Sequence, residues 1–145
     1  MLLNNKIIHQ AFLLAALVAL FTACSKAPDL SGKWLDQQDK VNGLRLDKEG
    51  YAWFVNGDKE AGGERFLRED GKEMQMKYEL NTEKSPMWLD LVLVEKATGK
   101  EESRRMCIIN LLDKNTMELM MGFATRDTKF DKASKGYSLL KREEE

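Results

Sequence analysis

Histidine is almost absent from this chain: the only one among its 145 residues is His9, close to the N-terminus. Ser-His-Asp and Cys-His nucleophile systems need an imidazole, and so do histidine-based zinc and iron sites. Beyond residue 9 the sequence therefore offers no residue for any of these. We expect a protein that is not an enzyme and that holds no metal and no cofactor.

The sequence also lacks any block of one charge. It has 23 Lys and Arg against 24 Asp and Glu, and the two signs are interspersed. Without a basic patch we expect no nucleic-acid partner. Five aspartates lie at positions predicted to be turns or surface, and their spacing matches neither a calcium loop nor a catalytic pair. They are Asp36, Asp39, Asp47, Asp58 and Asp90.

No apolar run is long enough to cross a bilayer, which takes about 20 residues. The longest uninterrupted run, residues 11–21, follows a single basic residue, Lys6, and precedes Thr22, Ala23 and Cys24. A basic start, a short apolar core and small residues before a processing point predict a secretory signal peptide over residues 1–23.

The cysteine after that small pair resembles the lipobox of bacterial lipoproteins. The resemblance implies that the Cys24 thiol receives a diacylglycerol, that the chain is cut before it, and that the new N-terminus carries a fatty acyl chain such as palmitate. Residues 24–30 then form a tether to the membrane. An aspartate at position 25 would favour retention in the inner membrane, so Ser25 favours the outer membrane. The alternative is an ordinary signal peptide whose cleavage site lies beside a cysteine.

With Cys24 lipidated, Cys107 has no partner for an internal disulfide. It lies in the apolar run 106–109, which favours a small buried hydrophobic side chain. The alternative, a reactive thiol, would need a lowered pKa, and only Arg104 and Arg105 stand near it in sequence.

Short alternating segments separated by turn residues predict an all-β meander of about eight strands in a single domain, residues 31–142. The clearest segment, 74–80, alternates apolar and polar residues and follows the hairpin signal Asp70-Gly71. Residues 56–63 are predicted as a flexible loop, and the tail 143–145 is expected to fray. The predicted strands begin near residue 32 and continue over 43–47, 51–55, 64–69, 74–80, 88–94, 105–112, 116–123 and 136–141.

An antiparallel up-and-down sheet of this size protects its edges best by closing into a β-barrel. Segments 88–94 and 105–112 are apolar on both faces. We expect their outer faces to be covered by the N-terminal segment, the C-terminal segment or a partner.

Gly32-Lys33-Trp34 at the start of the first strand resembles the lipocalin signature. The resemblance, to a bacterial lipocalin-like (calycin) lipoprotein, also covers the 48–50 turn, Tyr78 and residues 86–91, and extends over 30–142. It implies that Trp34 closes one end of the barrel and that Arg126 lies on its ring. For Gly32, Trp34 and Arg126 this role is structural.

Methionine and aromatic residues at inward positions suggest a ligand cavity, since methionine adapts to more than one shape. The predicted function is to bind or carry a small apolar or amphipathic ligand in the cell envelope. The alternative is an envelope accessory protein that has a filled interior and docks another protein. The candidate cavity residues are Trp53, Met74, Met76, Tyr78, Met106, Met117, Leu119 and Met121.

Overall fold

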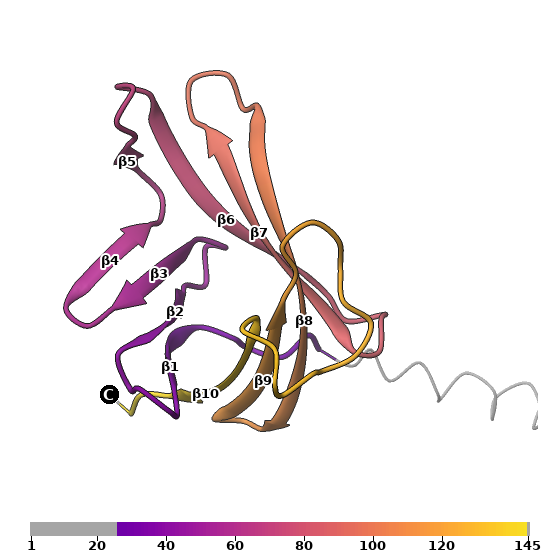
Figure 1. The fold of residues 1–145 in the computed structure, drawn as a ribbon. Helices are drawn as coiled ribbons and strands as arrows, with labels where there is room; N and C mark the ends of the chain where they lie inside the picture. Colours follow the sequence, from indigo (N-terminus) through magenta and orange to yellow (C-terminus); the bar gives the residue numbers. More distant parts are fainter. Residues whose placement is uncertain (1–25, 145) are drawn as a thin grey trace, which may run out of the picture.

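Ten antiparallel strands make up the computed structural model, which describes residues 26–144 (Figure 1). The all-β meander predicted from the sequence is confirmed, with ten strands instead of about eight. Residues 26–144 contain no helix with the length and apolar character needed to cross a membrane. The signal peptide and Cys24 lie outside the described residues. The strands are β1 (Gly32–Asp36), β2 (Asn42–Leu46), β3 (Ala52–Asn56), β4 (Lys59–Gly62), β5 (Phe66–Leu67), β6 (Glu73–Asn81), β7 (Met87–Glu95), β8 (Glu101–Asp113), β9 (Thr116–Met121) and β10 (Tyr137–Arg142).

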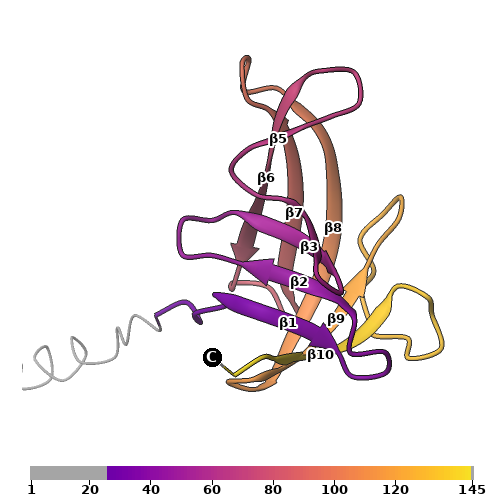
Figure 2. The same ribbon diagram turned by 90° about the vertical axis from the view of Figure 1, so that its left-hand side faces the viewer.

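The strands form one sheet that rolls into a nearly closed barrel. Its order is β4-β3-β2-β1-β10-β9-β8-β7-β6-β5, so the two edge strands are consecutive in the chain. The gap between them is bridged at a few points. Tyr51 pairs with Lys77, and the backbone N–H of Met76 donates to the carbonyl of Gly63 (2.8 Å). Figure 2 shows β1, β2 and β3 crossing in front of the longer β6, β7 and β8.

The prediction of a flexible loop at residues 56–63 is wrong, because β3 ends at Asn56 and β4 takes up Lys59–Gly62. Asn56 pairs with Lys59, so a two-residue turn, Gly57-Asp58, joins β3 to β4. Gly57 adopts a φ of 60°, which suits glycine at the first position of such a turn. The next predicted strand, 64–69, shrinks to Phe66–Leu67 in the structure.

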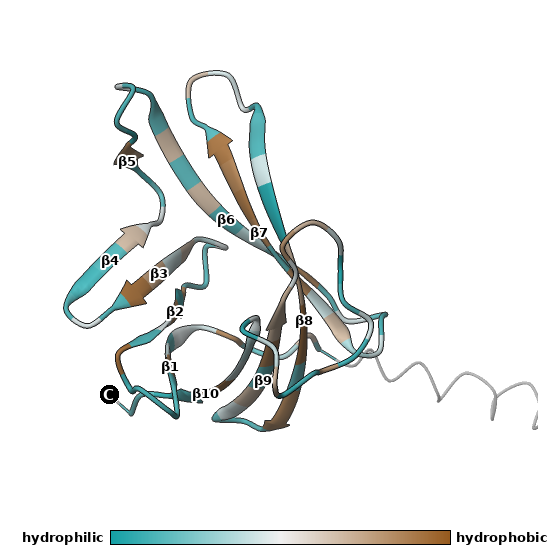
Figure 3. Ribbon diagram, in the orientation of Figure 1, coloured by the Kyte–Doolittle hydropathy of each residue, from teal (hydrophilic) through white to brown (hydrophobic). Residues whose placement is uncertain are grey.

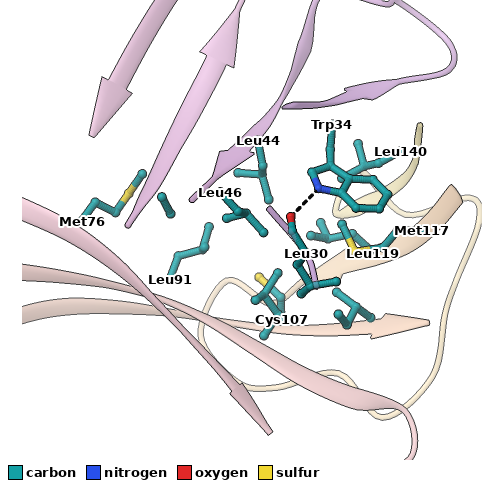
Figure 4. Packing of buried hydrophobic residues seen from close by; sticks show 13 residues of the cluster. Leu30, Trp34, Leu44, Leu46, Met76, Leu91, Cys107, Met117, Leu119 and Leu140 are labelled. Carbon is teal, nitrogen blue, oxygen red and sulfur yellow. Dashed lines mark hydrogen bonds between the residues drawn. The ribbon is translucent and has the colours of Figure 1, made fainter. Parts of the chain in front are cut away.

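The interior is filled by side chains that point inward from every wall (Figure 4). These side chains point inward because successive residues of a strand face opposite sides of the sheet. Figure 3 shows this in β6, where hydrophilic and hydrophobic residues alternate along the strand. Leu30, assigned to the tether from the sequence, is buried in this core. The buried cluster consists of Leu30, Trp34, Leu44, Leu46, Ala52, Met76, Leu89, Leu91, Cys107, Ile109, Met117, Leu119 and Leu140.

A second layer lies on the outside of the barrel. Val92 and Ile108 belong to the outward face of β7 and β8, yet they are only 3% and 1% exposed. The segment between β9 and β10, residues 122–136, contacts this face: the Gly122 N–H donates to the Met106 carbonyl (3.1 Å), and Arg126 reaches β7. Residues 122–136, from the C-terminal part of the chain, therefore cover part of the apolar outer face of β7 and β8, for which the sequence analysis expected a cover.

Candidate functional site

Trp34 fills the interior of the barrel near the end where β1 begins and β10 finishes, which we call the closed end. Its side chain is fully buried, and its Nε1 donates to the carbonyl of Leu30 (2.8 Å). The guanidinium of Arg142 lies 4.4 Å from the centre of the indole ring. The same guanidinium donates to the carbonyls of Ser31, Asp29 (2.8 Å) and Lys114 (3.1 Å), which joins three parts of the chain at this end. Residues 29–31 therefore lie against Trp34 and Arg142 at this end of the barrel.

The expected contact between Arg126 and Trp34 is wrong, because Arg142 occupies that place. Trp34 and Arg142 are paired directly in the β1–β10 register. Gly32 makes room beside them, since a Cβ there would lie 3.4 Å from the Arg142 side chain, and its φ is +126°. Arg126 instead lies 4.1 Å from the ring of Trp88, on the outside of the barrel.

Six of the eight candidate cavity residues face the interior. Met76, Met117 and Leu119 belong to the buried cluster, Tyr78 and Met121 pack against it, and Met74 is buried on the same side of β6.

Trp53 and Met106, the other two, face outward. Trp53 alternates with the buried Ala52 and carries the Arg45 guanidinium 3.5 Å from its ring centre. Met106 precedes the buried Cys107 on β8 and lies opposite Asp90, which is on the outer face. In each case the strand is one residue out of phase with the assumed alternation, and a shift of one residue exchanges the two faces.

The open end of the barrel retains a hollow of about 160 Å³. It lies where β1 and β3 end and β10 begins. Asp36 of the lining ends β1, so the hollow and Leu30 lie toward opposite ends of that strand, with Trp34 between them. Its lining is apolar at the bottom and polar at the rim. The lining residues are Asp36, Asn42, Gly43, Leu44, Phe54, Leu119, Met121, Ser138 and Leu140.

The size of this hollow limits what it can hold. Pockets for drug-sized molecules measure about 300–1,000 Å³, whereas an apolar cavity of about 150 Å³ holds a benzene ring. Phe54, which is 39% exposed, stands at the rim and also lines an outer hollow of about 700 Å³ over β2–β4. A ring or a short alkyl chain fits inside, with any longer part continuing past Phe54.

Asp36 is the only charged residue in the lining of the hollow. It ends β1 on the inward face, opposite Leu140. Its Oδ1 accepts a hydrogen bond from the Gln38 N–H (2.7 Å), and no lysine or arginine of residues 26–144 forms an ion pair with it. Asn42, by contrast, is tied to Asp39 (2.6 Å) and to Asn56 (2.8 Å).

Asp90 forms a charged cluster on the outer face, although the sequence suggested a turn or surface position for it. It lies in the middle of β7 and is nearly buried. Arg126 binds both of its oxygens (2.6 and 2.9 Å), and Arg104 adds a third contact (2.9 Å). Burial by itself would raise the pKa of Asp90, but the hydrogen bonds and charges of Arg126 and Arg104 lower it below the ordinary value. This cluster holds residues 122–136 on the barrel.

Cys107 is fully buried in the core, and burial raises the pKa of its thiol to about 12. In the part of the chain that the structure describes, no three His, Cys, Asp or Glu side chains gather as a metal site requires. Comparisons with protein-family models, with curated proteins and with solved structures give no match. The geometry of the chain itself is therefore the basis for assigning a function.

Proposed function

We propose that this protein is a lipid-anchored envelope lipoprotein, with a lipocalin-like barrel that binds a small apolar or amphipathic ligand at its open end. The observation that carries the proposal is the apolar hollow of about 160 Å³ left in an otherwise filled interior. Its bottom is formed by Leu44, Leu119 and Leu140. Burial of each methylene of a ligand there contributes about 0.8 kcal/mol, so affinity grows about fourfold per carbon until the hollow is full.

The anchor and the hollow lie at opposite ends of the proposed assembly. Leu30 is fixed beside Trp34 at the closed end. The tether from Cys24 to Leu30 reaches about 20 Å at most. We expect the closed end to face the membrane and the open end to face away from it, where a ligand can enter from the aqueous side.

Ligand binding is tested on a chain that begins at Ser25, because every residue of the buried cluster lies between Leu30 and Leu140. The probe is hexanol, followed by protein-observed NMR, and native mass spectrometry looks for co-purified molecules. Met121→Trp should fill the hollow and abolish the binding of hexanol. Leu112→Trp, on an exposed position of β8, is the matched control and should bind as the parent does. Absence of binding by the parent chain contradicts the ligand proposal.

The anchor is tested by growing cells with labelled palmitate. We expect label on the parent chain and on Cys107→Ala, and none on Cys24→Ser. An ordinary signal peptide predicts an unlabelled protein that is released from membranes after cleavage, and that result would remove the lipoprotein part of the proposal while leaving the ligand part standing.

Docking to another envelope protein is the second candidate function. Its first basis, the apolar outer face around Val92 and Ile108, is buried within the chain itself. What favours it now is Phe123, which is 71% exposed at the start of the 122–136 segment. Crosslinking from position 123 in membranes checks this candidate, and the same crosslinker at Leu112 is the control.

A further inference from the structure

We infer that the ligand of the open end is a cationic amphiphile: a short apolar body with a protonated amine at its head. The inference rests on the proposed function, because it names the chemical class of molecule that the hollow selects. Its basis is the position of Asp36 in the rim.

Asp36 offers a free acceptor at the mouth of an apolar hollow. The residue is half-buried, and its neighbour on the inward face, Leu140, belongs to the bottom of the hollow. One carboxylate oxygen accepts from the Gln38 N–H (2.7 Å). The other, Oδ2, has no hydrogen-bond donor among residues 26–144. A head group that brings a positive charge and N–H donors would satisfy it while the body lies on Leu44 and Leu119.

The rest of the lining does not provide a cation that could receive an anionic head. Ser138 is neutral, and the Asn42 amide is held by Asp39 and Asn56. Across the rim, Lys59 and Glu60 line the outer hollow but not the hollow that holds Asp36, and Glu60 is paired with Arg45 at 2.7 Å. A carboxylate or phosphate head would therefore meet the charge of Asp36 at close range, whereas an ammonium head would be attracted to it.

Three probes with the same alkyl chain separate the head group from the body: hexylammonium, hexanol and hexanoate, titrated into the Ser25 chain near pH 7. We expect hexylammonium to bind about fivefold more tightly than hexanol, which is the upper range for a partly exposed ion pair, and hexanoate to bind most weakly. Asp36→Asn should remove the preference for hexylammonium and leave the affinity for hexanol unchanged. The asparagine still accepts from Gln38, so an unchanged hexanol affinity also shows that the hollow is intact.

Glu83→Gln is the matched control, since it removes one negative charge from the exposed β6–β7 turn and should keep the preference. Equal binding of the three probes, tighter binding of hexanoate, or a preference that survives Asp36→Asn overturns the inference and leaves the ligand proposal intact. Failure of all three probes to bind overturns both.

Discussion

Two arginine–tryptophan contacts lie on opposite faces of the rolled sheet, one inside the barrel and one outside, and they differ in what the arginine donates to. Arg142 stacks on Trp34 inside the barrel and donates to backbone carbonyls. Arg126 stacks on Trp88 outside the barrel and binds a carboxylate, that of Asp90. The first contact joins the chain ends at the closed end. The second pins a long connecting segment to β7.

Replacement of Arg126 by alanine should destabilise the protein by about 3 kcal/mol, because it leaves the nearly buried Asp90 carboxylate with Arg104 alone. Urea denaturation of the two chains measures the difference. Arg65→Ala is the control: Arg65 is 69% exposed and pairs with Glu73 at the surface, so its loss should cost less than about 1 kcal/mol. Equal effects of the two changes would show that Asp90 does not depend on Arg126.

The loss of unfolding free energy caused by Arg126→Ala should also depend on pH. The pKa of Asp90 is lowered in the folded protein, so its contribution is present above the unfolded value, near 4, and is lost as the pH falls through the folded value. We expect the difference in unfolding free energy between the parent and Arg126→Ala to be full near pH 7 and to shrink below about pH 4. Other carboxylates titrate alike in both chains and cancel in the difference. A constant difference between these pH values would contradict the assignment.

At the scale of the residue, composition and patterning predicted side-chain types better than partners. The sequence pointed correctly to an aromatic at Trp34 that packs inside, and to a buried Cys107. It could not decide between Arg126 and Arg142, because that choice follows from the β1–β10 register, which joins residues 108 positions apart only once the barrel closes. Asp90 was misjudged for the same reason: its partner Arg126 comes from a distant segment.

At the scale of the element, the sequence predicted most ends of the clearly alternating strands to within one or two residues. The best case is β6, predicted as 74–80 and observed as Glu73–Asn81. β4 was missed although Gly57-Asp58 is a hairpin signal, because glycines at 57, 62 and 63 suggested flexibility. All three adopt positive φ: Gly57 forms the turn from β3 to β4, and Gly62 and Gly63 turn the chain from β4 toward β6. Here glycine sets a specific path and does not loosen the chain.

Gly63 tests this point, because it lies against the indole of Trp53. A Cβ at Gly63 would be 2.1 Å from the ring, whereas a Cβ at Gly71 would meet nothing within 4 Å. Both residues have positive φ (83° and 80°), so the backbone cost of alanine, about 1 kcal/mol, is shared. Gly63→Ala should cost about 2 kcal/mol more than Gly71→Ala in urea denaturation, owing to the clash. Equal losses would mean that Trp53 moves away without cost.

At the scale of the whole molecule, the two ends of the barrel have different properties. The closed end gathers Leu30, Trp34 and Arg142, and the chain leaves it toward the proposed anchor. The open end keeps a small hollow with Asp36 at its rim. This asymmetry could not be predicted from the sequence. The alternation of each strand determines only which of its side chains point inward, whereas the place of an empty space depends on how the strands cross in the closed barrel.

Cys107 offers a measure of how the whole barrel opens. In the chain that begins at Ser25 it is the only cysteine, its side chain is fully buried, and burial, with the nearby charge of Asp90, raises the pKa of its thiol to about 12. Alkylation requires an exposed thiolate. Iodoacetamide should therefore label the folded chain at least about 1,000-fold more slowly than the unfolded chain, as a stability of several kcal/mol requires.

The denaturant dependence of that labelling decides between global and local opening. If Cys107 becomes exposed only when the barrel unfolds, the logarithm of its labelling rate should rise with urea along the slope of equilibrium unfolding. A chain carrying Cys107→Ala and Phe123→Cys, with its thiol at a position that is 71% exposed, should label rapidly and without that slope. Slow labelling of Cys107 that is independent of urea would show that β8 opens locally, and the closed barrel would then not behave as a single cooperative unit.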